Sequence, residues 1–129
     1  MLLDDLSSYL SPLVVYPVQK GQLLELPDTV VAMRETGGYA SQYAAGSGVG
    51  HVVFDEPTLQ VVTRAKDYQT AMSTCRTVYD LLNGLREQLI NGVLYHFIRA
   101  LQPPFFLMRD ENKRYLCAFN IHVQRRSAT

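Results

Sequence analysis

The chain has 129 residues, of which 47% are hydrophobic and 19% are charged, a composition that excludes a disordered or low-complexity protein. A chain of this length is expected to fold as a single domain, residues 1–129. Twelve basic and twelve acidic side chains cancel, so the chain lacks the overall positive field that would attract nucleic acid or an anionic membrane.

The N-terminal residues predict a short amphipathic helix. Leucines recur at helical spacing between Leu2 and Leu10, with two aspartates in the first turn, where the helix dipole favours them, and Pro12 just beyond. The segment has no basic region, so it does not have the pattern of a signal peptide. No apolar run in the chain approaches the roughly 20 residues that would span a bilayer, so we expect no membrane segment.

Extended structure is predicted next. Residues 13–27 are apolar but interrupted by two prolines and a glycine, which favours a loop with at most a short edge strand. Residues 29–36 and 58–65 both have the pattern of mostly buried strands, because apolar side chains occupy positions on both faces.

The segment between these two strands, residues 37–56, is rich in glycine. Its GSGVG run does not match the dinucleotide-binding fingerprint, and neither a phosphate-binding lysine nor a helical pattern follows it. Asp55 and Glu56 would also repel a phosphate. We therefore predict no nucleotide site, but a long flexible loop that becomes ordered against a partner.

The strongest periodicity in the chain predicts a helix over residues 68–82, with Asp67 as its N-cap and Gly84 just past its end. Residues 85–90 are expected to add a further helical turn before Asn91-Gly92 stops it.

The C-terminal third predicts strands. Residues 93–101 form one strand, and residues 105–108 and 114–124 form a hairpin. Cys75 and Cys117 have neither metal-ligand nor disulfide spacing and fall on predicted apolar faces, so we expect buried free thiols in a reducing compartment.

The order of elements predicts an α+β fold. We expect a mostly antiparallel mixed sheet of about four to five strands, with one long helix packed on a face and a short N-terminal helix. The register places apolar side chains on the face opposite the long helix. These are Val62, Tyr95, Phe97 and Leu101. Two alternatives follow: a partner chain covers this face, or the first helix or residues 13–27 cover it.

The sequence shows no convergent catalytic or metal-binding pattern. His96 and His122 lie on different predicted strands that could be neighbours, but a metal site needs further ligands that the sequence does not place nearby. The carboxylate pairs at residues 55–56 and 110–111 fall in predicted turns, where acids are normally solvated. We therefore predict no enzyme activity, no metal and no cofactor.

Several motifs in fixed order resemble the tail terminator proteins of long-tailed bacteriophages, which are also described as tail completion or minor capsid proteins. The resemblance covers about residues 2–125. The positions that carry it are Pro27-Asp28, Thr36-Gly37-Gly38, the run Thr63-Arg64-Ala65-Lys66-Asp67-Tyr68, Pro104, Asp110-Glu111 and Arg114. Lys113 stands where that family commonly has glycine.

The resemblance implies a structural virion protein, assembled in the host cytoplasm, that forms a six-membered ring at the head-proximal end of the tail tube. The ring would end tube polymerisation and provide the surface for head joining. Its partners would be further copies of itself, the tail tube protein and a head-completion or connector protein. Genomic DNA would pass through the ring without sequence-specific binding.

Two alternatives to a tail terminator stay open: another head–tail neck or connector adaptor, and a small enzyme or nucleotide-binding protein. For the interface, we expect Arg64 to pair with a neighbour's Asp110 or Glu111, although an intramolecular or solvated arginine fits equally well. Within the loop and at its ends, contacts are expected from further residues, namely Tyr39, Tyr43, His51 and Phe54.

Overall fold

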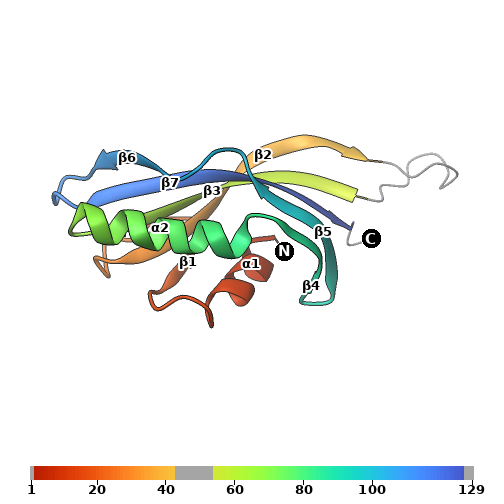
Figure 1. The fold of residues 1–129 in the computed structure, drawn as a ribbon, viewed down its shortest axis with the longest axis horizontal. Helices are drawn as coiled ribbons and strands as arrows, with labels where there is room; N and C mark the ends of the chain where they lie inside the picture. The colour runs from red at the N-terminus through yellow and green to blue at the C-terminus, as the bar shows by residue number, and fades with distance from the viewer. Residues whose placement is uncertain (1, 43–53, 127–129) are drawn as a thin grey trace, which may run out of the picture.

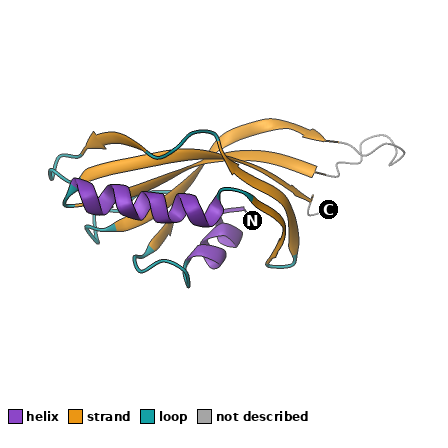
Figure 2. Cartoon of the chain, in the orientation of Figure 1, coloured by secondary structure: helices purple, strands orange, loops and turns teal. Residues whose placement is uncertain are grey.

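The structure is a computed structural model that describes residues 2–42 and 54–126. In these two ranges, both helices lie on the same face of a curled sheet and none covers the opposite face (Figures 1 and 2). The fold is therefore α+β, as predicted. Within the described ranges, no helix is both long enough and apolar enough to cross a membrane.

The two helices are α1 (Leu2–Leu10) and α2 (Tyr68–Leu82). The strands, in chain order, are β1 (Val18–Lys20), β2 (Val30–Gln42), β3 (Phe54–Ala65), β4 (Leu85–Ile90), β5 (Val93–Ala100), β6 (Phe105–Arg109) and β7 (Tyr115–Arg126). Across the described residues the sheet thus has seven strands, more than the predicted four to five.

The sheet order is β1-β2-β3-β7-β5-β4, with β6 also paired to β7. β5 lies beside the C-terminal part of β7 and β6 beside its N-terminal part, so the two short strands share one edge of the long one. Every pair is antiparallel except β1 with β2, which confirms the prediction of a mostly antiparallel mixed sheet.

Residues 85–90 form strand β4, so the predicted extra helical turn is wrong. Gly84 takes a φ of 91°, which ends the helical direction, and its amide donates to the Ile98 carbonyl. Asn91 and Gly92 have φ values of 51° and 77°, the positive pair that a tight hairpin turn requires. Asn-Gly is therefore a hairpin signal here, and it pairs β4 with β5.

The glycine-rich segment is largely strand at both ends, in contrast to the predicted loop over residues 37–56. β2 continues to Gln42 and β3 begins at Phe54, while residues 43–53 lie outside the described residues. Gly37, with a φ of 112°, lies at a register shift between the two strands. A Cβ on Gly38 would stand 2.7 Å from the Glu56 carbonyl oxygen. These two glycines therefore permit a bulge and a close backbone approach.

The core lies between the helices and one face of the sheet. Asp67 caps α2 as predicted by accepting a hydrogen bond from the Thr70 amide at 3.0 Å. Alternate residues of β3 and β7 face the helices as the sequence predicts, and both cysteines are buried. The side chains buried from these elements include Leu59, Val61, Ala65, Cys117, Phe119, Ile121 and Val123.

Tyr95 is fully buried in this core, so its predicted position on the opposite face is wrong. The pairing of β5 with β7 shifts between Tyr95 and Phe97, and this irregularity breaks simple alternation. Part of the opposite face is covered from within the chain, because Leu23 packs against Val62 there. Leu101 is 49% exposed.

Candidate functional site

Several of the motif residues that are scattered through the sequence meet in one polar cluster at the end of the sheet. We call it the arginine cluster, and its members are Glu25, Pro27, Asp28, Arg64, Asp110 and Arg114. The two arginines are 3% and 4% exposed, and buried guanidinium groups require partners for their donors. The partners come from the irregular segment before β2 and from the turn between β6 and β7.

Arg64 binds backbone oxygens of its own chain. Its Nε donates to the Asp28 carbonyl at 3.1 Å, and its Nη2 donates to the carbonyls of Pro27 at 2.5 Å and Glu25 at 3.2 Å. This arrangement corresponds to the intramolecular alternative. An additional contact between Arg64 and a neighbour's Asp110 or Glu111 stays a prediction.

Arg114 joins three carboxylates across 89 residues of sequence. Its Nε donates to Asp110 at 2.8 Å, its Nη1 to Asp28 at 3.2 Å and its Nη2 to Glu25 at 3.2 Å. Nη1 also donates to the Glu25 carbonyl at 2.5 Å. The side chain therefore connects the β6–β7 turn to residues 25–28 and fixes both against the sheet.

Two carboxylates of the cluster, Asp28 and Asp110, have pKa values below the ordinary range. Burial is the largest single influence on Asp110 and would raise its pKa, but the hydrogen bonds from the backbone and guanidinium of Arg114, together with the charge of that guanidinium, outweigh burial and lower the pKa. A hydrogen bond from Lys66 lowers the pKa of Asp28, with Arg114 adding to the effect. Asp28 and Asp110 therefore favour the charged form and are bound to basic side chains, which suits a structural role better than acid–base chemistry.

A second polar group lies further along the same face, where β3 runs between β2 and β7. His122 is 5% exposed, and its Nε2 lies 3.0 Å from Glu56, while Nη2 of Arg99 lies 3.2 Å from its Nδ1. Because a guanidinium only donates, Nδ1 accepts and the proton is on Nε2, which donates to Glu56. Tyr39 and Phe97 enclose the ring at centroid distances of 4.5 and 5.1 Å.

The two strand histidines do not form a shared site. Their strands are neighbours, as predicted, but His96 is exposed and contacts Glu87 at 2.5 Å, whereas His122 contacts Glu56. Among residues 2–42 and 54–126, no group of three or more potential metal ligands occurs.

The other predicted interface residues fall in different places. Tyr39 is 56% exposed on β2 beside His122, and the ring of Phe54 lies 5.5 Å from that of His96. Glu111 is exposed in the β6–β7 turn. Tyr43 and His51 lie outside the described residues. The structure therefore unites Arg64 with Asp110 in one cluster, and places Tyr39 and Phe54 some distance along the sheet from it.

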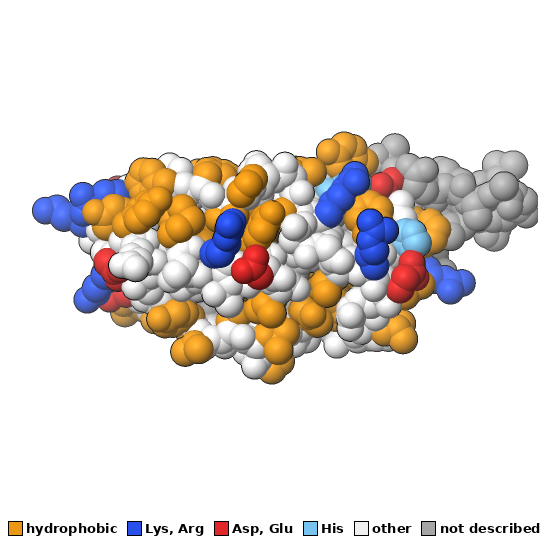
Figure 3. Space-filling model, viewed as in Figure 1, with side chains coloured by type: hydrophobic (Ala, Val, Ile, Leu, Met, Phe, Trp, Pro, Cys, Tyr) orange, Lys and Arg blue, Asp and Glu red, His pale blue; other side chains and the backbone are white. Residues whose placement is uncertain are grey.

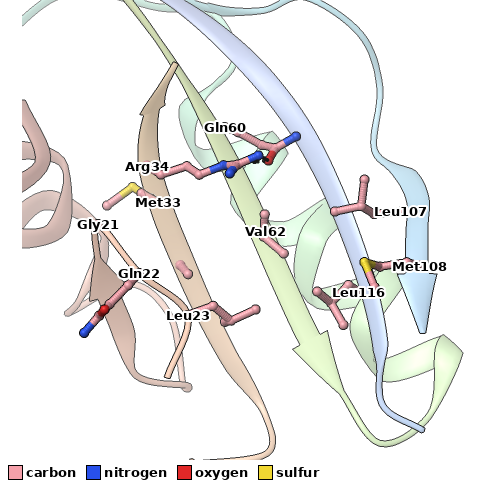
Figure 4. A pocket seen from close by; sticks show the side chains of 11 residues that line it. Gly21, Gln22, Leu23, Met33, Arg34, Gln60, Val62, Leu107, Met108 and Leu116 are labelled. Atoms are coloured by element: carbon pink, nitrogen blue, oxygen red, sulfur yellow. Dashed lines mark hydrogen bonds between the residues drawn. The ribbon is translucent and has the colours of Figure 1, made fainter. Parts of the chain in front are cut away.

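An apolar groove, which the sequence did not reveal, lies on the open face beside the arginine cluster (Figure 4). It has a volume of about 310 Å³. Its lining comes from residues 21–23 and from β2, β3, β6 and β7, and Arg34 is its charged member. Because these segments are distant in sequence, only pairing of the strands brings them together.

Comparisons with known proteins agree with this picture. A family described as bacteriophage tail terminator protein matches residues 9–126. No curated protein matches the chain. Among solved structures, the fold resembles a chain in the virion of a native gene transfer agent (GTA) particle, with 13% sequence identity and a TM-score of 0.56, over 92% of this chain and 84% of that chain. At this identity the structural likeness shows the fold alone.

The family match covers nearly the whole described chain and includes every residue of the arginine cluster. It also shows the kind of protein: a structural component of the phage tail rather than a member of a known enzyme class. The chain belongs to the family of bacteriophage tail terminator proteins.

Proposed function

We propose that this chain forms a ring, most simply a hexamer, at the head-proximal end of the phage tail tube. The ring ends polymerisation of the tube and provides the surface to which the filled head joins. The observation that carries this proposal is the family match over residues 9–126. The partners are further copies of the chain, the tube protein and a head-completion protein, and DNA passes through the ring without sequence-specific contacts.

The surface of the protein supports an assembly role. Large hydrophobic side chains are exposed in separate parts of the chain, among them Val15 at 93% and Leu26 at 70% in the segment between α1 and β2, and Leu89 at 67% on β4. Strands β1 and β4 end the sheet on opposite sides. Unlike surfaces on two sides of one subunit allow head-to-tail contacts, and such contacts close into a ring when the rotation between subunits is right. The described residues that we expect at contacts with partners are Arg64, Asp110, Glu111, Tyr39 and Phe54.

The test is a tube-capping assay. Purified protein is added to polymerising tube protein, and tube ends and lengths are measured by negative-stain microscopy. A terminator produces short tubes with a ring at one end, and light scattering gives the number of copies. Tubes that grow to the same length with and without the protein would contradict the proposal. Binding to the head connector without any effect on tube growth would instead indicate a neck adaptor.

A further inference from the structure

The groove on the open face has an apolar floor and two apolar walls. Its floor consists of Ala32, Val62 and Leu116, which come from three adjacent strands. Leu23 forms one wall, and Leu107 and Met108 of β6 form the other (Figure 4). When a partner's apolar side chain displaces water from a concave apolar surface of this kind, the free energy of the complex is lowered.

The walls continue outward into exposed apolar side chains. On β6, Met108 is 50% exposed and Leu107 is 39% exposed, while Leu24 beside the other wall is 47% exposed. Figure 3 shows hydrophobic side chains gathered at the end of the molecule where β6 lies. A contiguous apolar patch of this kind marks an interaction surface in a water-soluble domain.

One end of the groove carries a prearranged positive charge. Nε and Nη2 of Arg34 both donate to Oε1 of Gln60, at 3.0 and 2.8 Å. Gln60 is only 9% exposed, so it holds the guanidinium in a fixed position. In the described part of the chain, no carboxylate lies within ion-pair distance of Arg34. The charge is therefore available to a partner.

The distance between the apolar floor of the groove and the Arg34 guanidinium determines which partner segment fits. Ala32 pairs with Val62, and Arg34 pairs with Gln60 two residues further along the same strands. Two residues of strand span about 7 Å. An extended polypeptide that places an apolar side chain in the groove therefore places the side chain two residues further along at the Arg34 guanidinium. A carboxylate at that position is favoured, because guanidinium groups bind carboxylates with paired hydrogen bonds.

We propose that this groove is the docking site for an extended segment of a partner protein, in which apolar side chains are followed two residues later by a carboxylate. The charge complementarity of Arg34 and the apolar lining select this occupant. This docking site goes beyond the proposed function, because a single subunit contains the whole groove and can bind the segment whatever the number of subunits in the ring.

The test uses nuclear magnetic resonance titration of the ¹⁵N-labelled full chain with two synthetic peptides. The first is acetyl-Thr-Leu-Thr-Leu-Thr-Glu-Thr-amide, and the second has lysine in place of glutamate. We expect the acidic peptide to shift amide signals of Ala32–Arg34, Val62 and Leu107–Met108, with the lysine peptide binding about tenfold more weakly. No shifts with millimolar acidic peptide, or equal binding of both peptides, would overturn the proposal.

Two variants sharpen the test without disturbing the core. Arg34 is exposed, so Arg34→Glu is expected to fold and to reverse the preference toward the lysine peptide. Met108→Asp is expected to abolish binding of both peptides. Leu89→Asp, at a side chain 67% exposed on β4, is the matched control and leaves binding unchanged. A preference that stays acidic in Arg34→Glu contradicts the assigned role of Arg34.

Other outcomes separate this inference from the proposed function. If the wild-type chain self-associates and Met108→Asp makes it monomeric, a second copy occupies the groove and the proposal is overturned. Normal capping of tubes by a chain that binds neither peptide overturns the docking site and leaves the terminator role intact. Binding of the acidic peptide by a chain that never caps tubes overturns the terminator role and leaves the docking site intact.

Discussion

The hydroxyl of Tyr95 in β5 donates a hydrogen bond of 2.6 Å to the carboxylate of Asp5 in α1, across 90 residues of sequence. Both side chains are buried, with exposed fractions of 0% and 3%. Asn91 donates a second hydrogen bond to the other carboxylate oxygen at 3.0 Å. This relationship attaches the N-terminal helix to the β4–β5 hairpin, two elements that share little other contact surface.

Tyr95→Phe should therefore destabilise the fold. It removes one donor and leaves a buried carboxylate oxygen without it, at a cost of about 1–3 kcal/mol in the free energy of unfolding. Tyr79→Phe is the matched control, because Tyr79 packs against Phe119 in the same core at a centroid distance of 5.6 Å and no hydrogen bond of its hydroxyl is seen among the described residues. Urea denaturation measures both. Equal, small effects would mean that the Tyr95 hydroxyl contributes nothing.

Removal of the Arg114 guanidinium should also destabilise the fold. Arg114→Met leaves three carboxylates without their shared cation, and water can reach these carboxylates in part, so we expect the free energy of unfolding to fall by about 1–3 kcal/mol. The control is Arg109→Met, because Arg109 is exposed and lies over the ring of Tyr115 at 4.6 Å. Chemical denaturation of the two variants provides the comparison, and a loss no larger than that of the control would show that the cluster does not stabilise the fold.

Acid should weaken the same cluster. Because Asp110 has a lower pKa in the folded state than its ordinary value of 3.8, its ionisation stabilises the fold above about pH 4, and this contribution is lost as pH falls through the folded-state pKa. The variant Asp110→Asn should be less stable at neutral pH and should lose less stability than the wild type between about pH 5 and 3. Thermal denaturation across this range measures the difference, and parallel curves would contradict the assignment.

Lys113 has a φ of 62°, a left-handed conformation that costs a non-glycine residue about 1 kcal/mol or more. Lys113→Gly should accordingly raise the free energy of unfolding by about 0.5–1 kcal/mol, since glycine adopts this conformation without strain. Lys113→Ala retains the strain and should give no gain. Denaturation midpoints measured at equal ionic strength compare the two variants, and a gain in both would point to the lost charge instead.

Cys75 should be inert in the folded protein. Burial raises the pKa of its thiol to about 12, and burial also raises that of Cys117. Only thiolates react quickly with alkylating reagents, so iodoacetamide at pH 8 should modify neither cysteine until the chain unfolds. Mass spectrometry with and without denaturant checks this. Rapid modification of the native protein would indicate that the core opens locally.

Local sequence patterns were sufficient for elements whose burial is regular. The 3.6-residue period of α2 and the alternation in β3 and β7 predicted both the elements and the faces that they bury. The N-cap Asp67 and the hairpin of β6 and β7 were predicted for the same reason, since each depends on residues close together in the chain. The pattern also placed Cys75 and Cys117 in the core.

Pairing between distant segments decided the rest. Nothing within residues 85–90 distinguishes a helical turn from a strand, and only hydrogen bonding to β5 makes it β4. The register shift beside Tyr95 moved that side chain into the core. The sequence by itself determined the buried faces of α2, β3 and β7 and the order of the motifs. The tertiary structure decided that Arg64, Asp110 and Arg114 meet and that a groove forms beside them, because a buried charge takes its partners from whichever segments the sheet brings within reach.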